Sequence, residues 1–150
     1  MNGYEIDHVA IVVADLEATL ALYTRTLGFE QIYREIIGDQ GVEAVGLRAG
    51  DASVELLRPL DESSAIARFR GEAQSKVHHT AYRVADIRAE LARLRDLGVR
   101  LIDEEPRRGA QGNLIAFLHP RATGGVLIEL CQLAPKAGRD DTLARTRSSS

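Results

Sequence analysis

The sequence contains little of several features that mark particular classes of protein. Cys131 is the one cysteine, so neither an intramolecular disulfide nor a zinc site built from several thiolates can form. No apolar run approaches the roughly 20 residues that span a bilayer, and the first residues show no basic cluster followed by an apolar core. We therefore expect a cytoplasmic protein without membrane partners.

An excess of positive charge is also missing. The 19 basic residues are outnumbered by 22 acidic ones, and the two signs are interleaved. Proteins that bind DNA or RNA need a basic stripe or patch to neutralise phosphates. We therefore expect no nucleic acid partner. The 45% of hydrophobic residues among 150 is enough for one sizeable core, which indicates a single globular domain.

What the chain does contain is an internal repeat. Residues 7–13 are similar to residues 78–84, and the pair Asp15-Leu16 recurs as Asp86-Ile87, 71 residues later. Farther on, residues 54–57 recur as residues 128–131. Self-similarity at a nearly fixed offset indicates duplicated structural units. We expect one domain at 4–133, with modules at about 4–62 and about 77–133, and a polar C-terminal tail at 134–150.

Both copies carry the same signals of local structure. Asp15 can cap a helix that Gly28 ends, and Asp86 and Gly98 do the same in the second copy. The apolar stripe of the first helix comprises Leu16, Leu20, Tyr23 and Leu27. Apolar and β-branched runs predict the strands, at 31–37, 42–49 and 52–58, and at 79–84, 99–102, 114–119 and 126–133. The predicted fold is α+β, with two tandem βαβββ modules and a helical linker at 63–73.

A histidine on the first strand and a glutamate on the last strand recur in register. These residues are His8, Glu55, His79 and Glu129. A single strand histidine is more often a hydrogen-bonded residue than a metal ligand. The two glutamates have apolar neighbours, however, and burying a carboxylate among them is costly unless it is paired or metal-bound. Because pseudo-twofold packing would bring the two sets together, we predict one shared metal site.

The donor set limits the choice of ion. Imidazole and carboxylate without thiolate suit a divalent ion such as cobalt, nickel, manganese, iron or zinc. Four protein ligands on an octahedral ion leave two open positions, which can hold a substrate through two oxygens.

These residues belong to a wider resemblance that covers nearly all of residues 4–133. The segments that carry it are Ile6-Asp7-His8-Val9-Ala10, Asp39-Gln40-Gly41-Val42, Val54-Glu55-Leu56-Leu57-Arg58-Pro59-Leu60, Val77-His78-His79, Gly98-Val99-Arg100-Leu101-Ile102-Asp103-Glu104-Glu105-Pro106, Phe117-Leu118-His119-Pro120 and Gly124-Gly125-Val126-Leu127-Ile128-Glu129-Leu130. On these segments the chain resembles the vicinal oxygen chelate (glyoxalase/bleomycin resistance) superfamily, and within it the methylmalonyl-CoA epimerases.

The resemblance implies a vicinal-oxygen-chelate-type curved mixed sheet around a metal cleft. It implies a metal-dependent epimerase that interconverts the C2 epimers of methylmalonyl-CoA, a coenzyme A thioester, through a metal-stabilised enolate. It also implies cobalt as the first choice of metal and a homodimer as the usual assembly.

Such a reaction needs two acid/base groups, one on each side of C2. Glu129 matches a residue that serves as one base in the family. At the position where some members carry a second acid, an ungapped match places Ala44. The neighbouring Glu43 is the remaining candidate, but it can replace that acid only if its strand is bulged or shifted in register, because adjacent strand residues point to opposite faces. An exposed strand glutamate is the alternative interpretation of Glu43.

Two other functions fit the same pattern. A glyoxalase I-like lactoylglutathione lyase would use the same ligands on a glutathione adduct. A metal-free small-molecule-binding resistance protein of the same fold would need only the cleft between the copies, and the four ligand-type residues argue against it.

Overall fold

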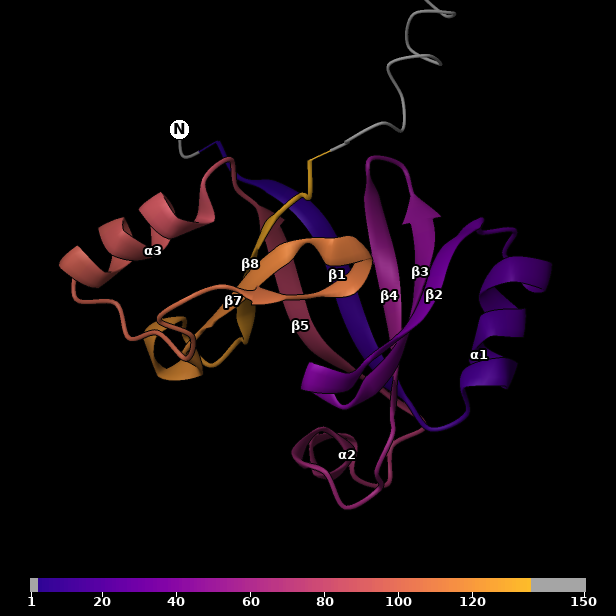
Figure 1. Ribbon diagram of the computed structural model, residues 1–150. Helices are drawn as coiled ribbons and strands as arrows, with labels where there is room; N and C mark the ends of the chain where they lie inside the picture. The colour runs from indigo at the N-terminus through magenta and orange to yellow at the C-terminus, as the bar shows by residue number, and fades with distance from the viewer. Residues whose placement is uncertain (1–2, 136–150) are drawn as a thin grey trace, which may run out of the picture.

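The structure, a computed structural model, describes residues 3–135 (Figure 1). Its strands form one eight-stranded mixed sheet in the order β2-β3-β4-β1-β5-β8-β7-β6. The strands are β1 (Glu5–Val13), β2 (Gln31–Ile37), β3 (Val42–Ala49), β4 (Ala52–Pro59), β5 (Ser75–Arg83), β6 (Arg107–Arg108), β7 (Leu114–Leu118) and β8 (Ile128–Gln132). The helices are α1 (Leu16–Ala21), α2 (Ala65–Arg70) and α3 (Ile87–Asp96). Most of the predicted polar tail, residues 136–150, lies outside the described residues.

The strand order confirms the duplication. The first copy supplies β2-β3-β4-β1 and the second supplies β5-β8-β7-β6, so the two halves join where β1 pairs antiparallel with β5. In each copy the first strand pairs in parallel with the last, and the registers are equivalent, because Ala10 pairs with Glu55 and Ala81 with Glu129. The predicted α+β fold of two tandem βαβββ modules in one curved mixed sheet is therefore confirmed.

The helices begin where the sequence predicts. The Asp15 side chain accepts the amide hydrogen of Ala18 at 3.0 Å, and that of Asp86 accepts the amide hydrogen of Ala89 at 3.1 Å. α1 and α3 flank the curved sheet at opposite ends in Figure 1, and their buried leucines pack against one face of it. None of the helices in the described part of the chain is long and apolar enough to cross a bilayer.

The prediction that Leu27 belongs to the buried apolar stripe of the first helix is wrong. After α1 the chain continues as a π-helical segment over Leu22–Thr26, and Leu27 is 56% exposed. A π-helical turn holds more residues than an α-helical turn, so side chains beyond it no longer follow the 3.6-residue spacing. The ring of Phe29 packs edge-to-face against Tyr23 instead, with the ring centroids 5.3 Å apart.

The predicted strand at 99–102 is also wrong. There, Leu101 makes an isolated bridge with Leu118, and the strand equivalent to β2 is the two-residue β6. Asp103 explains the early end of the pairing, because its side chain accepts the amide hydrogen of Phe117 at 2.9 Å. A side chain that binds a backbone group in this way competes with the ladder of a regular strand.

The two faces of the sheet have different neighbours. On β3, Val45 and Leu47 belong to a buried cluster with α1, which makes this the convex, helix-covered face. Val42 and Ala44 point the other way, into a cluster that also contains Ala10 of β1. The concave face is therefore the one that carries residues from both copies toward a shared site.

A pair of leucines at α3 tests the packing of the convex face. Leu91 is 1% exposed and Leu97 is 67% exposed. We expect Leu91→Ala to lower the free energy of unfolding by about 2–5 kcal/mol, because it leaves a cavity, and Leu97→Ala to change it by less than about 0.5 kcal/mol. Urea denaturation measures both values, and equal losses would contradict the packing described.

Candidate metal centre

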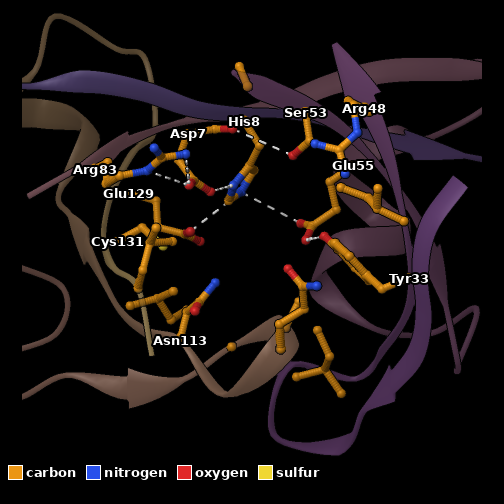
Figure 2. A pocket seen from close by; sticks show the side chains of 18 of the residues that line it. Asp7, His8, Tyr33, Arg48, Ser53, Glu55, Arg83, Asn113, Glu129 and Cys131 are labelled. Carbon is orange, nitrogen blue, oxygen red and sulfur yellow. Dashed lines mark hydrogen bonds and ion pairs between the residues drawn. The ribbon is translucent and has the colours of Figure 1, made fainter. Parts of the chain in front are cut away.

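Four side chains converge on the concave face where the two copies meet. His8 comes from β1, Glu55 from β4, His79 from β5 and Glu129 from β8, and none of them is more than 6% exposed. Figure 2 shows His8 between the two glutamates, with Glu129 on one side and Glu55 on the other. The structure therefore brings His8, His79 and Glu129 of the predicted site into one compact group, with Glu55 beside His8.

The spacing of the donor atoms fits a single ion. The Nε2 atoms of His8 and His79 lie 3.2 Å apart, and the oxygens of Glu129 lie 3.4 Å from the first and 3.3 Å from the second. Two ligands at about 2.1 Å from one metal, in neighbouring positions, are roughly 3.0–3.4 Å apart. These three residues form the one compact group of possible metal ligands among the described residues.

A cation in this position would satisfy the carboxylate of Glu129. Its Oε1 atom is buried and has no hydrogen-bond partner in the described structure. Burial raises the pKa of Glu129 to about 8, although the positive charge of His8 acts in the opposite direction. An unpartnered buried carboxylate oxygen is rare in folded proteins, and an ion at this point would complete its coordination.

The ring of His8 is oriented by a neighbour on its own strand. Its Nδ1 atom lies 2.7 Å from a carboxylate oxygen of Asp7, and Arg83 of β5 donates to the other oxygen of Asp7 at 3.1 and 3.2 Å. Burial opposes ionisation of Asp7, but the hydrogen bonds from His8 and Arg83 outweigh it and lower its pKa. A proton held on Nδ1 by Asp7 leaves the lone pair of Nε2 free for a metal.

His79 has an equivalent neighbour. Its Nδ1 atom lies 2.7 Å from the Nδ1 of His78, whose ring packs edge-to-face against Phe69. The sequence predicts that His78 faces away from the site and has no metal role. In the structure, His78 contacts the Nδ1 atom of His79, and the Nε2 atom of His79 is the one that lies in the donor cluster.

Glu55 lies at the edge of the cluster. Its Oε1 atom is 3.7 Å from the Nε2 of His8, and its Oε2 atom accepts a hydrogen bond of 2.6 Å from the hydroxyl of Tyr33. Tyr33 could not be predicted from the sequence, because no motif marks it and its proximity to Glu55 follows from the pairing of three strands.

The structure does not bring Glu43 into this cluster. Glu43 is adjacent to Ala44 on β3 and shares the convex face with Val45, and it forms ion pairs of 2.9 Å with Arg34 and with Arg58. The hydrogen bond from Arg34, ahead of that from Arg58, lowers the pKa of Glu43. The strand has no bulge between Ala44 and Glu43 that would turn this side chain toward His8. Its position supports a structural ion pair and not a catalytic base.

A cavity of about 520 Å³ opens beside the cluster. It is lined by residues of both copies, including Tyr33 and Glu55 from the first and Glu129 and Asn113 from the second. The loop at 109–113 closes one side, where the amide of Gln111 donates to Glu35 at 2.6 Å. A small polar substrate group can therefore reach the donor atoms from solvent.

Known proteins are similar to this chain in sequence and in fold. Residues 7–117 match the family model described as the Glyoxalase/Bleomycin resistance protein/Dioxygenase superfamily. The chain is 41% identical over 130 residues to an ethylmalonyl-CoA/methylmalonyl-CoA epimerase of Cereibacter sphaeroides. The matched region covers 85% of this chain and 97% of that protein. The crystal structure of methylmalonyl-CoA epimerase from Mycobacterium tuberculosis is similar, with a TM-score of 0.83, 44% identity and coverage of 87% of this chain and 89% of that one.

A further solved structure is similar and contains a ligand. It is a methylmalonyl-CoA epimerase in complex with methylmalonyl-CoA and NH4+, with a TM-score of 0.82 and 40% identity. The matched region covers 87% of this chain and 94% of the chain in that structure.

The buried cluster predicts how stability depends on pH. Burial disfavours the charged form of His8, but the hydrogen bond to Asp7 and the charges of Glu55 and Glu129 outweigh it and raise the pKa of His8 to about 9. The stability from this bound proton is complete below pH 6.5 and is lost as the pH rises through 9. The raised pKa of Glu129 acts in the same direction, because the cost of its buried charge grows between pH 4.5 and 8. Burial lowers the pKa of His79 well below 6.5, so His79 adds no pH dependence above pH 7.

We therefore expect the Tm of the metal-free protein to fall by about 5 °C between pH 6.5 and 8.5. Saturating divalent metal should remove this fall, because the ion takes the place of the protons. Calorimetry with chelator and with added metal measures both effects. As a control, Glu43→Gln should leave the pH dependence unchanged, whereas Glu129→Gln should reduce it. A Tm of the metal-free protein that stays constant over this range would contradict the electrostatics described.

Proposed function

The chain belongs to the glyoxalase/bleomycin resistance protein/dioxygenase superfamily, and on this premise we propose that it is a methylmalonyl-CoA epimerase. The reaction interconverts the two C2 epimers by removing a proton on one face of the carbon and returning one on the other. The observation that carries the proposal is the convergence of His8, His79 and Glu129, including a carboxylate oxygen without a hydrogen-bond partner, beside an open cavity whose wall includes His8 and Glu129.

We infer that His8, Glu55, His79 and Glu129 hold a divalent metal ion, with cobalt as the first choice and nickel, manganese, iron or zinc as the alternatives. When bound, such an ion supplies Lewis-acid stabilisation for the negative charge of an enolate. Asp7 and His78 hold the two imidazole rings with the donor nitrogens toward the cluster. Loss of either contact would leave the ring free to rotate and weaken binding.

Glu129 is the group that we assign to proton transfer on one face of C2. It lies on the cavity wall formed by the second copy, where a substrate group that enters from solvent can reach it. It is paired across β7–β8 with Phe117, whose ring packs against that of His79 with the centroids 5.1 Å apart. This apolar contact excludes water from the back of the carboxylate, so that its open side is the one facing the cavity.

The substrate class follows from the relatives named above and from the shape of the site. We infer a coenzyme A thioester whose acyl group enters the cavity, because 520 Å³ accommodates the acyl end and leaves the bulk of coenzyme A outside. The cytoplasmic location and the homodimer expected from the sequence stay predictions.

Hydrogen exchange at C2 of methylmalonyl-CoA in deuterated water tests the proposal. We expect metal-loaded protein to exchange this hydrogen and to epimerise the substrate, and Glu129→Gln to lower both rates by at least about 100-fold, because it removes a proton-transfer group. Glu43→Gln is the matched control, since it makes the same change on the convex face, and it should retain activity. Proton NMR follows exchange and a chiral assay follows epimerisation.

The outcomes separate the candidate functions. Metal binding without exchange at C2 would reject the epimerase and make glutathione hemithioacetals the next substrates to try, as for a lactoylglutathione lyase. Tight binding of a small molecule by protein that takes up no metal would favour a resistance protein of the same fold.

A further inference from the structure

An epimerase needs a second proton-transfer group, on the side of the substrate opposite Glu129. Glu43 lies on the convex face, and Ala44 of the concave face carries no acid. Among the titratable side chains that line the cavity, Tyr33 and Glu55 lie across from Glu129, with His8 between them, as Figure 2 shows. This inference rests on the proposed function.

Strand register places Tyr33 beside Glu55. Tyr33 pairs with Gly46 across β2–β3, and Gly46 pairs with Glu55 across β3–β4. Directly paired residues point to the same face of a sheet. The three residues therefore form a row on the concave face, and the hydroxyl of Tyr33 reaches Oε2 of Glu55 at 2.6 Å.

Gly46 makes this reach possible. A Cβ atom at Gly46 would lie 2.0 Å from Cε1 of Tyr33, so any side chain at this position would displace the ring. On β2 an irregularity between Gln31 and Tyr33 shifts the register by one residue, which places Tyr33 opposite Gly46. The tyrosine thus lies flat across β3 with its hydroxyl in the cavity.

The two oxygens of Glu55 have separate neighbours. Oε1 faces the Nε2 of His8 at 3.7 Å, on the side of the metal ligands, while Oε2 accepts the hydrogen bond from Tyr33. Glu55 could therefore receive a proton on Oε2 while Oε1 stays on the side of His8.

We propose that Tyr33 is the second proton-transfer group of the reaction and that it acts as a relay with Glu55. As the C2–H bond breaks, its proton passes to the oxygen of Tyr33 while the phenol proton passes to Oε2 of Glu55, and the electron pair stays on the substrate as the enolate. The reverse transfer returns a proton to C2. Because the two protons move together along this hydrogen bond, no charge accumulates on Tyr33.

Tyr33→Phe tests the relay, because it removes the hydroxyl and keeps the ring. Each epimer of methylmalonyl-CoA is incubated separately with the metal-loaded variant in deuterated water. One epimer presents its C2 hydrogen to Glu129 and the other presents it to Tyr33. We expect the first to exchange with retained configuration, the second not to exchange, and epimerisation to fall at least about 100-fold in both directions. The signature is exchange without inversion, from one epimer only.

Two further measurements exclude a structural role. Tyr23→Phe is the matched control, because Tyr23 packs in the convex cluster with α1, and it should behave like the unchanged protein. The metal affinity of Tyr33→Phe should stay within about threefold of the unchanged protein, since the ligand side of Glu55 is not altered.

The outcomes distinguish this inference from the function on which it rests. Rapid inversion of methylmalonyl-CoA by Tyr33→Phe would overturn the relay alone. An equal loss of exchange from both epimers, together with weaker metal binding, would also overturn it, because Tyr33 would then be a residue that only positions Glu55. Unchanged protein that neither exchanges nor inverts either epimer would overturn the proposed function and the relay together.

Discussion

The cost of burying carboxylates beside imidazoles is the constraint on which this structure depends. Glu129 and Glu55 are each at most 5% exposed, and a buried ion without a partner destabilises a fold by several kcal/mol. Hydrogen bonds offset part of this cost at Glu55, through Tyr33, whereas one oxygen of Glu129 has no such partner. A cation bound among His8, His79 and Glu129 would offset the remainder of this cost. Under the proposed function, the stability of the protein and the chemistry of its site would then depend on the same ion.

The contacts behind the cluster make its geometry rigid. His8 is held by Asp7, and Asp7 is held by Arg83 of the other copy, so one imidazole is oriented by a contact that crosses the junction of the modules. His79 rests against His78 on its own strand. Because β1 and β5 pair along their length, the rings cannot separate without breaking the centre of the sheet. The four side chains of the cluster are thus positioned by regular strands and not by loops.

The duplicated fold and the four residues of the cluster could be predicted from the sequence because the internal repeat contains the signals for both. His8 and His79 occupy equivalent positions, and so do Glu55 and Glu129, and the strand pairing preserves that equivalence. The exposure of Leu27 could not be predicted, since a π-helical segment follows no simple sequence rule. The position of Tyr33 was also missed. It depends on a register shift in β2 and on Gly46 of a neighbouring strand, and these are tertiary features.

The pairing of each glutamate has an evolutionary consequence. Glu55 pairs with Gly46 and Glu129 pairs with Phe117, which are equivalent positions of the two copies. An ancestor assembled from two identical single modules would have carried the same residue beside both glutamates, because its symmetry axis would have passed between them. In a single chain the two positions are free to differ. Here one is a glycine that leaves room for the ring of Tyr33 and the other is an aromatic residue beside His79, so the two sides of the shared cavity present different groups to whatever binds there.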